Sequence, residues 1–587
     1  MIGNPTQTRG VQSFVQLYRS RFALAAGPPT ASGKTGRGFY MIRLRPASPI
    51  YRAVAPLALL PLLAILVGTA RSAAAQDAAI QAPLSIYWQF TSIPTPNNPA
   101  AVVEDGNTAY LAAGARVYAV NLADGSEKWR YPRSGNLPST IQGTPAIADG
   151  TLYLATGEGL AALDTATGKP AWPTYHVRGG AATAPRVVGS AVYFAGQNGS
   201  FYGVDAHSGL SLGGVWDQNG RIGIPSGGDL VGDFDIANGS LIYITADQAM
   251  HSVNIGTGVQ EWARRMDADV SNAHLVLGGE VMYVAAQNTL MQLRTMNGDP
   301  RWTIPLPSSA ATPPAVGPDG TVYLVCSNRR VYAINAQGHG AWKVFPKLPY
   351  DVAAQPTVAG GLVIVPTLEG GVFALDAATG TLKWNCKIAP SGRNATAIPT
   401  AANAVRRALV ANGALYVYTD DGTLTSFHSG DVADVAPRVK PVDPKSGDYL
   451  NGEPPFRVAA TITDGSSGLN FGTLSLMLDS ARIPFKGTPD DASADKPGFT
   501  FDPDTNTVEF FTTQTDVGRS NALSDGPHTA TVSVTDWSGV QTVKTWTFVV
   551  DNTLAKRSDT NNNQQGPGKG LGGNGGNGGN GGGGGGG

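Results

Sequence analysis

The sequence predicts an all-β chain in which a β-propeller is followed by a β-sandwich and a glycine-rich tail. Three observations lead to this prediction: a four-strand unit that recurs with a tryptophan at its end, a different strand pattern after residue 431, and 75 Gly and 41 Pro among 587 residues. Such a composition favours short strands and tight turns over long helices. A chain of this length is also expected to hold more than one domain.

The repeated unit ends with an apolar strand, an Asp or Asn, a turn that closes on Gly, and a Trp at a fixed offset. It is clearest in Val117–Trp129, Leu160–Trp172 and Val372–Trp384. Two shorter strands joined by a Gly-containing turn precede each copy, as in Thr144–Gly159. Four strands in a unit of about 40 residues are typical of a propeller blade.

The number of blades follows from counting the copies. Successive tryptophans of the repeat are 40 to 46 residues apart: Trp88, Trp129, Trp172, Trp216, Trp262, Trp302, Trp342 and Trp384. Trp88 has no blade before it, and the last copy, which begins at Thr423, has no Trp after it. We therefore predict eight blades, with Ser85–Phe90 supplying the outer strand of the last one. Such closure leaves no open sheet edge to invite aggregation.

The even spacing of these tryptophans indicates an architectural role. We expect each indole to fill the gap between neighbouring blades, because it is a large apolar plate. The Asp or Asn before each turn is expected to accept backbone N–H groups, and the Gly to permit a positive φ or a close approach of another backbone.

The pattern A-x-D-x-x-T-G-x-x-x-W, matched best by Ala119–Trp129 and Ala374–Trp384, resembles the docking motif of the pyrroloquinoline-quinone-like repeat family. The resemblance covers residues 85–431 and implies an eight-bladed quinoprotein-like propeller. That family has two branches that matter here: quinone-dependent alcohol dehydrogenases, and BamB-type scaffold propellers that act in outer-membrane assembly.

The dehydrogenase branch implies a quinone held between a Trp and a disulfide of adjacent cysteines, with a calcium ion and an aspartate base. The only cysteines, Cys326 and Cys386, fall on different predicted blades. The seven histidines are dispersed, and no acidic run has a clean calcium-ligand spacing. We therefore predict no catalytic residue, cofactor or metal, and a non-catalytic binding or scaffold protein. A quinoprotein-like oxidoreductase is the alternative.

Candidate binding residues are sought where the repeat is irregular, because loops on a rigid frame commonly carry binding. They are Arg221, Asp229, Asp233 and Asp235 before the fourth blade, and Arg406 and Arg407 in an insert of the eighth. A solvated loop is the alternative for the acidic stretch. The net charge of −1 offers no basic stripe for nucleic acid. We expect a monomer whose partners are other envelope or extracellular proteins.

Residues 41–75 have the order of an export signal. A positively charged segment precedes the apolar run Ala53–Ala70, and a small-residue cleavage motif ends before Gln76. Cleavage would leave no integral membrane span and a periplasmic or extracellular protein; an uncleaved anchor is the alternative. Residues 1–40 precede Met41, which we expect to be the true start.

After the repeat stops, alternating strands predict a β-sandwich over residues 437–552. The segments Thr463–Gly468 and Asp525–Gly539 resemble bacterial immunoglobulin-like modules of secreted and surface proteins. Residues 553–587 become nearly pure Gly and Asn, which cannot bury a core, so a disordered tail is expected. A surface adhesin acting through the sandwich is a further hypothesis.

Overall fold

The computed structural model describes most of the chain between residues 80 and 555. The described ranges are 80–94, 101–216, 221–223, 229–390, 403–430, 435–464, 467–489, 498–512 and 522–555. The predicted export signal, the segment before it and most of the glycine-rich tail lie outside them. Within these ranges the single helix is the 3-10 turn η1 (Leu368–Gly370), and no helix has the length and apolar character needed to cross a membrane.

Residues 80–430 form antiparallel sheets of consecutive strands. The first three are β2 (Ala101–Asp105), β3 (Thr108–Ala113), β4 (Arg116–Asn121) and β5 (Glu127–Tyr131); β6 (Ile141–Ala148), β7 (Thr151–Thr156), β8 (Gly159–Asp164) and β9 (Pro170–His176); and β10 (Arg186–Val188), β11 (Ala191–Gly196), β12 (Ser200–Asp205) and β13 (Arg221–Gly223). The next two are β14 (Leu230–Ala237), β15 (Ser240–Thr245), β16 (Ala249–Asn254) and β17 (Gln260–Arg265); and β18 (His274–Gly278), β19 (Val281–Ala286), β20 (Thr289–Arg294) and β21 (Pro300–Pro305).

The remaining sheets of this region complete the series. They are β22 (Ala315–Val316), β23 (Val322–Val325) and β24 (Val331–Ile334); β25 (Thr357–Ala359), β26 (Leu362–Pro366), β27 (Gly371–Asp376) and β28 (Leu382–Lys387); and β29 (Val405–Ala411), β30 (Ala414–Thr419) and β31 (Thr423–Ser429) with β1 (Leu84–Thr91). The middle strands are almost wholly buried, as in TAYLAA of β3. Continuous apolar strands of this kind need cover on both faces.

The sheet that contains β1 joins the two ends of this region. β1 pairs antiparallel with β31, and Trp88 lies opposite Ser426. The predicted pairing of the segment around Trp88 with the one that begins at Thr423 is therefore confirmed. The fourth strand of this last sheet is therefore β1, which comes from the opposite end of the region.

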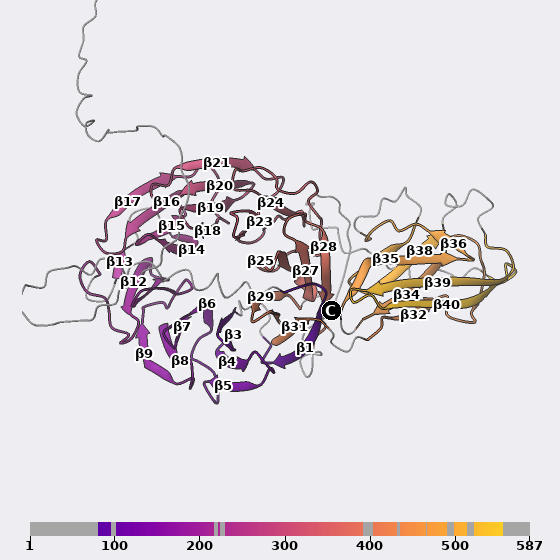
Figure 1. Ribbon diagram of the computed structural model, residues 1–587, viewed down its shortest axis with the longest axis horizontal. Coiled ribbons are helices and arrows are strands. Elements are labelled where there is room, and N and C mark those ends of the chain that lie inside the picture. Colours follow the sequence, from indigo (N-terminus) through magenta and orange to yellow (C-terminus); the bar gives the residue numbers. More distant parts are fainter. Residues whose placement is uncertain are drawn as a thin grey trace, which may run out of the picture. The chain divides into compact units, whose positions relative to one another are not determined.

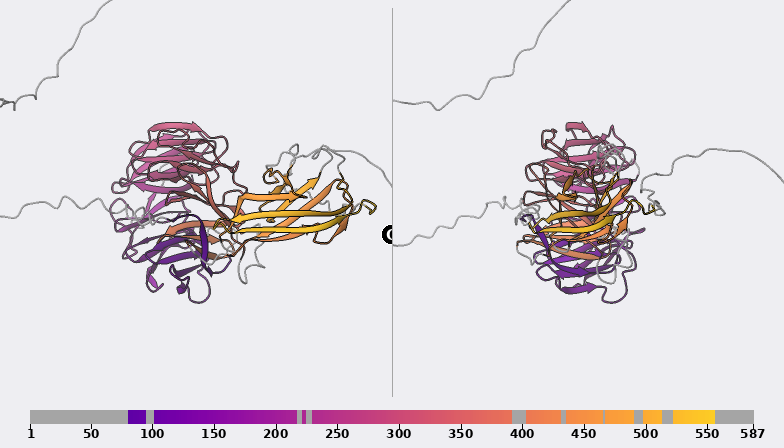
Figure 2. Two further views of the ribbon diagram at one scale, coloured as in Figure 1. Left: turned by 45° about the vertical axis from the view of Figure 1, so that its right-hand side comes forward. Right: turned by 90° about the vertical axis from the view of Figure 1, so that its right-hand side faces the viewer.

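The sheets are arranged around a common centre and form a β-propeller (Figure 1). The first strand of each sheet contacts the first strand of the next, in the order β2, β6, β10, β14, β18, β22, β25, β29 and again β2. Figure 1 shows β6, β14, β18 and β29 near the centre and β5, β9, β17 and β21 at the rim, and Figure 2 shows the same stack of sheets from the side.

Two predicted tryptophan strands are irregular. Among the described residues, the sheet of β22–β24 has three strands: Trp342 lies between the isolated bridges of Gly340 and Lys347, and its turn is one residue shorter than in the repeat. Trp216 likewise lies outside β13, after a lengthened connection. Both indoles are nevertheless buried, Trp216 with 4% and Trp342 with 5% of its surface exposed. Burial of the ring therefore does not depend on a regular strand.

Each rim tryptophan meets the next sheet at a contact that we call a seam. At the seam between the second and third sheets, Trp172 Nε1 donates to the carbonyl of Ala206 at 3.1 Å, and the Tyr153 hydroxyl donates to the same carbonyl at 3.0 Å. Gly209 ends the turn with φ of +68°, and a Cβ there would lie 2.5 Å from the Trp172 ring. Only glycine therefore fits this turn under the indole.

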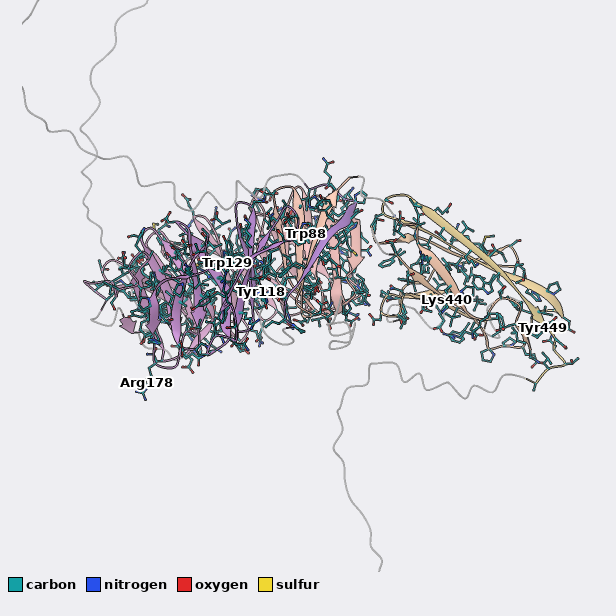
Figure 3. The ribbon with its side chains drawn as sticks, turned by 90° about the horizontal axis from the view of Figure 1, so that it is seen from below. Trp88, Tyr118, Trp129, Arg178, Lys440 and Tyr449 are labelled. Carbon is teal, nitrogen blue, oxygen red and sulfur yellow. The ribbon has the colours of Figure 1, made fainter. Side chains whose placement is uncertain are left out.

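The same hydrogen bond recurs at other seams. Indole donors and carbonyl acceptors are Trp88 with Leu122, Trp129 with Thr165, Trp216 with Ile255, Trp302 with Ala336, and Trp342 with Ala377. Trp262 Nε1 is buried without a partner among the described residues, although its ring lies over Gly298. Figure 3 labels Trp88 and Trp129 on neighbouring sheets.

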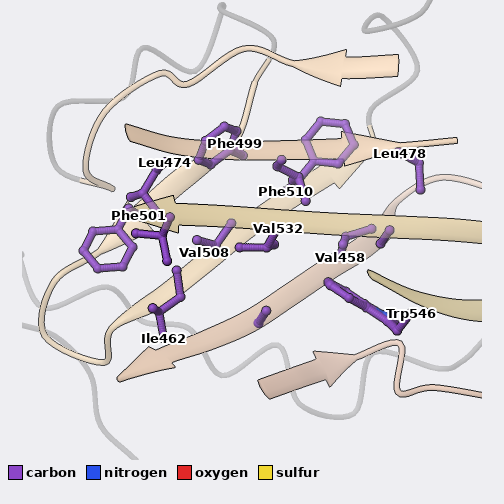
Figure 4. Close-up of a cluster of buried hydrophobic side chains, with 14 of the residues drawn as sticks. Val458, Ile462, Leu474, Leu478, Phe499, Phe501, Val508, Phe510, Val532 and Trp546 are labelled. Atoms are coloured by element: carbon purple, nitrogen blue, oxygen red, sulfur yellow. The ribbon is translucent and has the colours of Figure 1, made fainter. Parts of the chain in front are cut away.

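Residues after 435 form two sheets that share one core, a β-sandwich (Figure 4). The first contains β32 (Arg438–Asp443), β34 (Phe456–Thr463), β38 (Thr507–Thr512) and β37 (Thr500–Asp502); the second contains β33 (Tyr449–Leu450), β40 (Gln541–Val550), β39 (Gly526–Asp536), β35 (Leu469–Leu478) and β36 (Ala481–Ile483). Inward residues alternate along β39, as the period of two predicts. Val458, Val508, Val532 and Trp546 meet between the sheets.

Candidate functional site

A charged cluster lies on the inner strands of the third and fourth sheets. Arg186 Nη2 donates to Asp233 Oδ2 at 2.8 Å, and Arg186 Nε lies 3.6 Å from Asp235 Oδ1. The guanidinium carbon lies 5.8 Å from the centre of the Phe234 ring. The three charged side chains expose 32%, 44% and 31% of their surface, in the order Arg186, Asp233, Asp235, so a partner could reach the cluster. We call it the Arg186 cluster.

Local backbone structure orients the two carboxylates. The pairing of β14 with β15 shifts register between Val231 and Asp235, and Gly232 in this bulge has a φ of +70°. A β-bulge changes the direction in which nearby side chains point, and this bulge lies on the inner strand β14. Asp233 Oδ1 accepts the Phe234 N–H at 3.0 Å, and Asp235 Oδ1 accepts the Ile236 N–H at 2.9 Å. The acids are thus held in place before any partner binds.

Burial sets the electrostatics of the cluster. The pKa of Asp235 is raised mainly by desolvation, and the positive charge of Arg186 opposes this rise. Two acids share one cation, which leaves an excess of negative charge beside a partly exposed arginine. Charge-assisted contacts of this kind favour specific orientation of a charged partner more than raw affinity.

The predicted residues before the fourth blade do not all lie together. Asp233 and Asp235 join the Arg186 cluster. Asp229 is exposed and, within the described ranges, takes no part in it; its carbonyl accepts the Ala246 N–H. The side chain of Arg221 lies outside the described residues.

Sequence reasoning missed Arg186, although the repeat holds a signal for it. Four copies carry Pro before this inner-strand position, and the next residue is Ala146, Arg186, Ala315 or Thr357. Arg186 is the one charged residue in that comparison. Aligning the copies by their prolines would therefore have selected it.

Arg406 and Arg407 are adjacent in sequence but have different surroundings. Arg406 Nε and Nη2 each donate to the Asp420 carboxylate at 2.7 Å, and only 3% of that acid's side chain is exposed. The pKa of Asp420 is raised by burial, while the hydrogen bond and charge of Arg406 pull it down. This two-pronged pair within the last sheet is structural.

Arg407 follows a register shift in β29, an inner strand of the propeller. Its Nε atom is buried and has no hydrogen-bond partner among the described residues. Desolvation lowers the pKa of this guanidinium. Part of the side chain still reaches solvent. Burying charged atoms without a partner costs free energy. Arg407 is thus a second charged feature of the inner strands, in addition to the Arg186 cluster.

An outer groove of about 1050 Å³ borders the second and third sheets. Tyr175 and Tyr202 lie in it with ring centroids 6.3 Å apart; the Tyr175 hydroxyl pairs with Ser211 Oγ at 3.1 Å, and Asn198 Nδ2 donates to the Tyr202 hydroxyl at 2.7 Å. Arg178 projects from the same region in Figure 3. Aromatic rings and side-chain amides therefore line the groove.

The residues that a quinone site of the dehydrogenase type would need are not gathered. Cys326 and Cys386 are both free, lie in different core clusters, and have thiol pKa values raised by burial to about 12. Across the described ranges, no three His, Cys, Asp or Glu residues are placed to hold a metal ion. Cys326 and Cys386 therefore do not provide the disulfide of adjacent cysteines that this arrangement uses.

A comparison with protein families decides the relationship. A family model described as outer membrane protein assembly factor BamB matches residues 78–245 and 246–433. The chain belongs to the BamB family. The match spans the propeller and ends before the sandwich, so membership of the BamB family concerns the repeat region.

Curated relatives match parts of this BamB-family chain. BamB of Bordetella pertussis is 29% identical over 154 residues, 26% of this chain and 39% of the relative. The serine/threonine-protein kinase AfsK of Streptomyces griseus is 32% identical over 152 residues, 24% of this chain and 18% of the kinase. The matched part is thus about a fifth to two fifths of these relatives' length.

Solved structures to which this chain is similar include BamB from Moraxella catarrhalis, with a TM-score of 0.46, 18% identity, and coverage of 59% of this chain and 100% of that chain. A europium-containing methanol dehydrogenase has a TM-score of 0.45 and 16% identity, and covers 59% of this chain and 93% of that chain.

Proposed function

We propose that this BamB-family chain is an exported, non-catalytic binding or scaffold protein whose propeller holds other envelope or extracellular proteins. The observation that carries the proposal is the family match over residues 78–433, to a family described as an assembly factor. The partly exposed Arg186 cluster supplies oriented charges of the kind that select a protein partner.

The proposal includes an eight-bladed ring over residues 85–431. The closed cyclic order of the inner strands and the pairing of β1 with β31 support this number. We infer that the eight tryptophans of the repeat dock one blade to the next. Such a ring is a rigid frame on which loops and rim charges can vary.

For the rest of the chain, we propose an immunoglobulin-like sandwich over residues 437–552 and a disordered tail over 553–587. The two packed sheets and their shared core support the sandwich assignment. A cleaved signal over residues 41–75, with the true start at Met41, would deliver a monomer to the periplasm or the cell surface.

The test compares two single substitutions in the mature chain, residues 76–587. Asp233→Ala removes one acid of the Arg186 cluster while Asp235 remains, so stability should change by less than about 1 kcal/mol. Glu127→Ala is the matched control, because Glu127 pairs with Arg130 at 2.6 Å on the rim strand β5.

Each chain is immobilised, envelope proteins are captured and identified by mass, and the affinity of each purified partner is measured. We expect Asp233→Ala to weaken the affinity for one identified partner at least tenfold, and Glu127→Ala to leave that affinity unchanged. Equal capture by both variants contradicts the assignment of the Arg186 cluster. Saturable quinone binding together with dye-reducing turnover would contradict the scaffold function and identify an oxidoreductase. Attachment that depends only on residues 437–587 would favour an adhesin.

A further inference from the structure

Among the described residues, the seam beyond β28 lacks two parts that most of the other seams use, the repeat turn and a tyrosine beside the indole. The next sheet takes its rim strand, β1, from the N-terminal side, so no Gly-ended turn leads from β31 to a rim strand. Ile364 occupies the position in its sheet that Tyr153 occupies in the second sheet. Each of these two residues lies opposite an Ala, and that Ala lies opposite the tryptophan of the same sheet. Trp384 thus meets neither the repeat turn nor the partner tyrosine.

The sandwich supplies what this seam lacks. Trp384 Nε1 donates to the carbonyl of Ser467 at 2.8 Å, and its indole is completely buried. In the opposite direction, Trp537 Nε1 donates to Asn385 Oδ1 at 2.9 Å. Lys387 Nζ donates to the Pro503 carbonyl at 3.0 Å. Three residues of the rim strand β28 are therefore bonded to the sandwich.

The sandwich loop has the residue spacing of a repeat turn. Asp464, Ser467 and Gly468 are spaced as are Asp205, Ser208 and Gly209 in the third sheet. Gly468 has a φ of +85°, and a Cβ there would overlap the Asn385 carbonyl oxygen. The two turns differ in the indole acceptor: the third sheet offers the carbonyl that follows its Asp, and the sandwich offers that of its Ser.

Burial on β28 agrees with this contact. The residue after the rim tryptophan is exposed in three other sheets, at Arg130, Ala263 and Thr303. Its counterpart Asn385 exposes only 4% of its surface. Cys386 exposes 8% and lies in a cluster against which Trp537 packs.

We propose that the seam at Trp384 is a turn-binding socket, and that the chain's own sandwich fills it with Ser467 and Gly468. The sandwich is then held fixed against the propeller. Ser467 and Gly468 take the place of the repeat turn, which this seam lacks because β1 closes the ring. The socket takes a short segment in which a Ser carbonyl accepts the Trp384 indole N–H and a Gly of positive φ follows it. The inference does not rest on the proposed scaffold function.

The experiment measures the reactivity of the two buried thiols in the native mature chain. A thiol-alkylating reagent is added, and the labelling rate of each cysteine is read by mass spectrometry. Cys386 reports the socket, whereas Cys326 lies in another core cluster and serves as an internal control. Both thiols should label slowly in the unchanged chain; fast labelling of Cys386 alone there overturns the proposal.

Gly468→Ala should open the socket, because the added methyl group meets the Asn385 carbonyl. Gly447→Ala is the matched control: its φ is +84° and nothing lies within 4 Å of the added Cβ. We expect Gly468→Ala to speed labelling of Cys386 at least tenfold with Cys326 unchanged, and the control to change neither. An unchanged Cys386 rate, or equal acceleration of both thiols, overturns the proposal.

A second pair of variants covers the case in which Gly468→Ala does not fold. Trp537→Phe removes the indole N–H that Asn385 accepts, and Trp546→Phe removes one that the Pro444 carbonyl accepts within the sandwich. Trp537→Phe should raise the Cys386 rate severalfold above that of Trp546→Phe. Equal rates in the two variants would show that Asn385 and its neighbours are not held by the sandwich.

Discussion

Truncation of one seam tryptophan tests how the ring is held together. Trp172 is the chosen site because only 6% of its surface is exposed. Replacing a buried Phe or Trp by Ala costs about 3–5 kcal/mol of unfolding free energy. We expect Trp172→Ala to fall in that range, since its ring fills the space over Gly209 and against Tyr153.

The structure also separates the packing of the ring from its hydrogen bond. The Ala206 carbonyl keeps the Tyr153 hydroxyl at 3.0 Å when the indole donor is lost, so no buried acceptor is orphaned. The hydrogen bond should then account for about 1 kcal/mol. Trp172→Phe, which keeps an aromatic plate, should cost about 1–2 kcal/mol.

Equilibrium unfolding in urea measures both variants. Far-ultraviolet circular dichroism is the better probe, because ten tryptophans contribute to the fluorescence of the unchanged chain. Val259→Ala is the control: the side chain is 61% exposed and should change stability by less than about 0.5 kcal/mol. A cost below about 1 kcal/mol for Trp172→Ala, or equal costs for the Ala and Phe variants, would refute the seam account.

Three further predictions concern charged groups. Arg406→Met strands the buried Asp420 and should cost about 3–5 kcal/mol in urea unfolding, whereas Arg406→Met with Asp420→Leu should recover most of it; an undiminished loss in the double variant contradicts the pairing. Arg407→Met removes a partly buried guanidinium whose Nε has no partner among the described residues, and should raise the unfolding free energy by about 1 kcal/mol; a loss of stability would contradict this. Burial and the nearby Asp504 raise the pKa of Glu369 to about 8. The folded chain then holds a proton that the unfolded chain releases, so the contribution of Glu369 to stability is greatest below about pH 4.5 and falls as pH rises toward 8; Glu369→Gln should remove this part of the pH dependence in thermal unfolding, and a pH dependence equal to that of the unchanged chain refutes the shift.

Much of the fold was accessible from the chain because its signals are local and repeated. The turn of Asp164 to Gly168 shows this, since Asp164 Oδ1 accepts the Thr167 N–H at 2.8 Å and the Thr167 hydroxyl at 2.6 Å. Such bonds depend only on neighbours in sequence, and so recur wherever the residues do. Counting the copies also predicted that the strand of Trp88 pairs with the last copy of the repeat.

The candidate site was only partly predictable. Irregularity of the repeat pointed to Asp233 and Asp235, but their cation, Arg186, belongs to the preceding sheet, 47 residues away from Asp233. The same criterion placed Arg406 and Arg407 together, although one is paired within its sheet and the other is not. Adjacent residues on a strand point to opposite faces, so proximity in sequence does not give shared surroundings.

The sequence by itself determined the strand order of the propeller, its turn chemistry and its ring-closing pair, because each depends on patterns that repeat along the chain. Only the tertiary structure decided which charges meet at Arg186 and what covers Trp384. The Ser467 carbonyl lies 83 residues from that indole, beyond the end of the repeat. Contacts between distant segments depend on how completed sheets pack against each other, which residue spacing alone does not give.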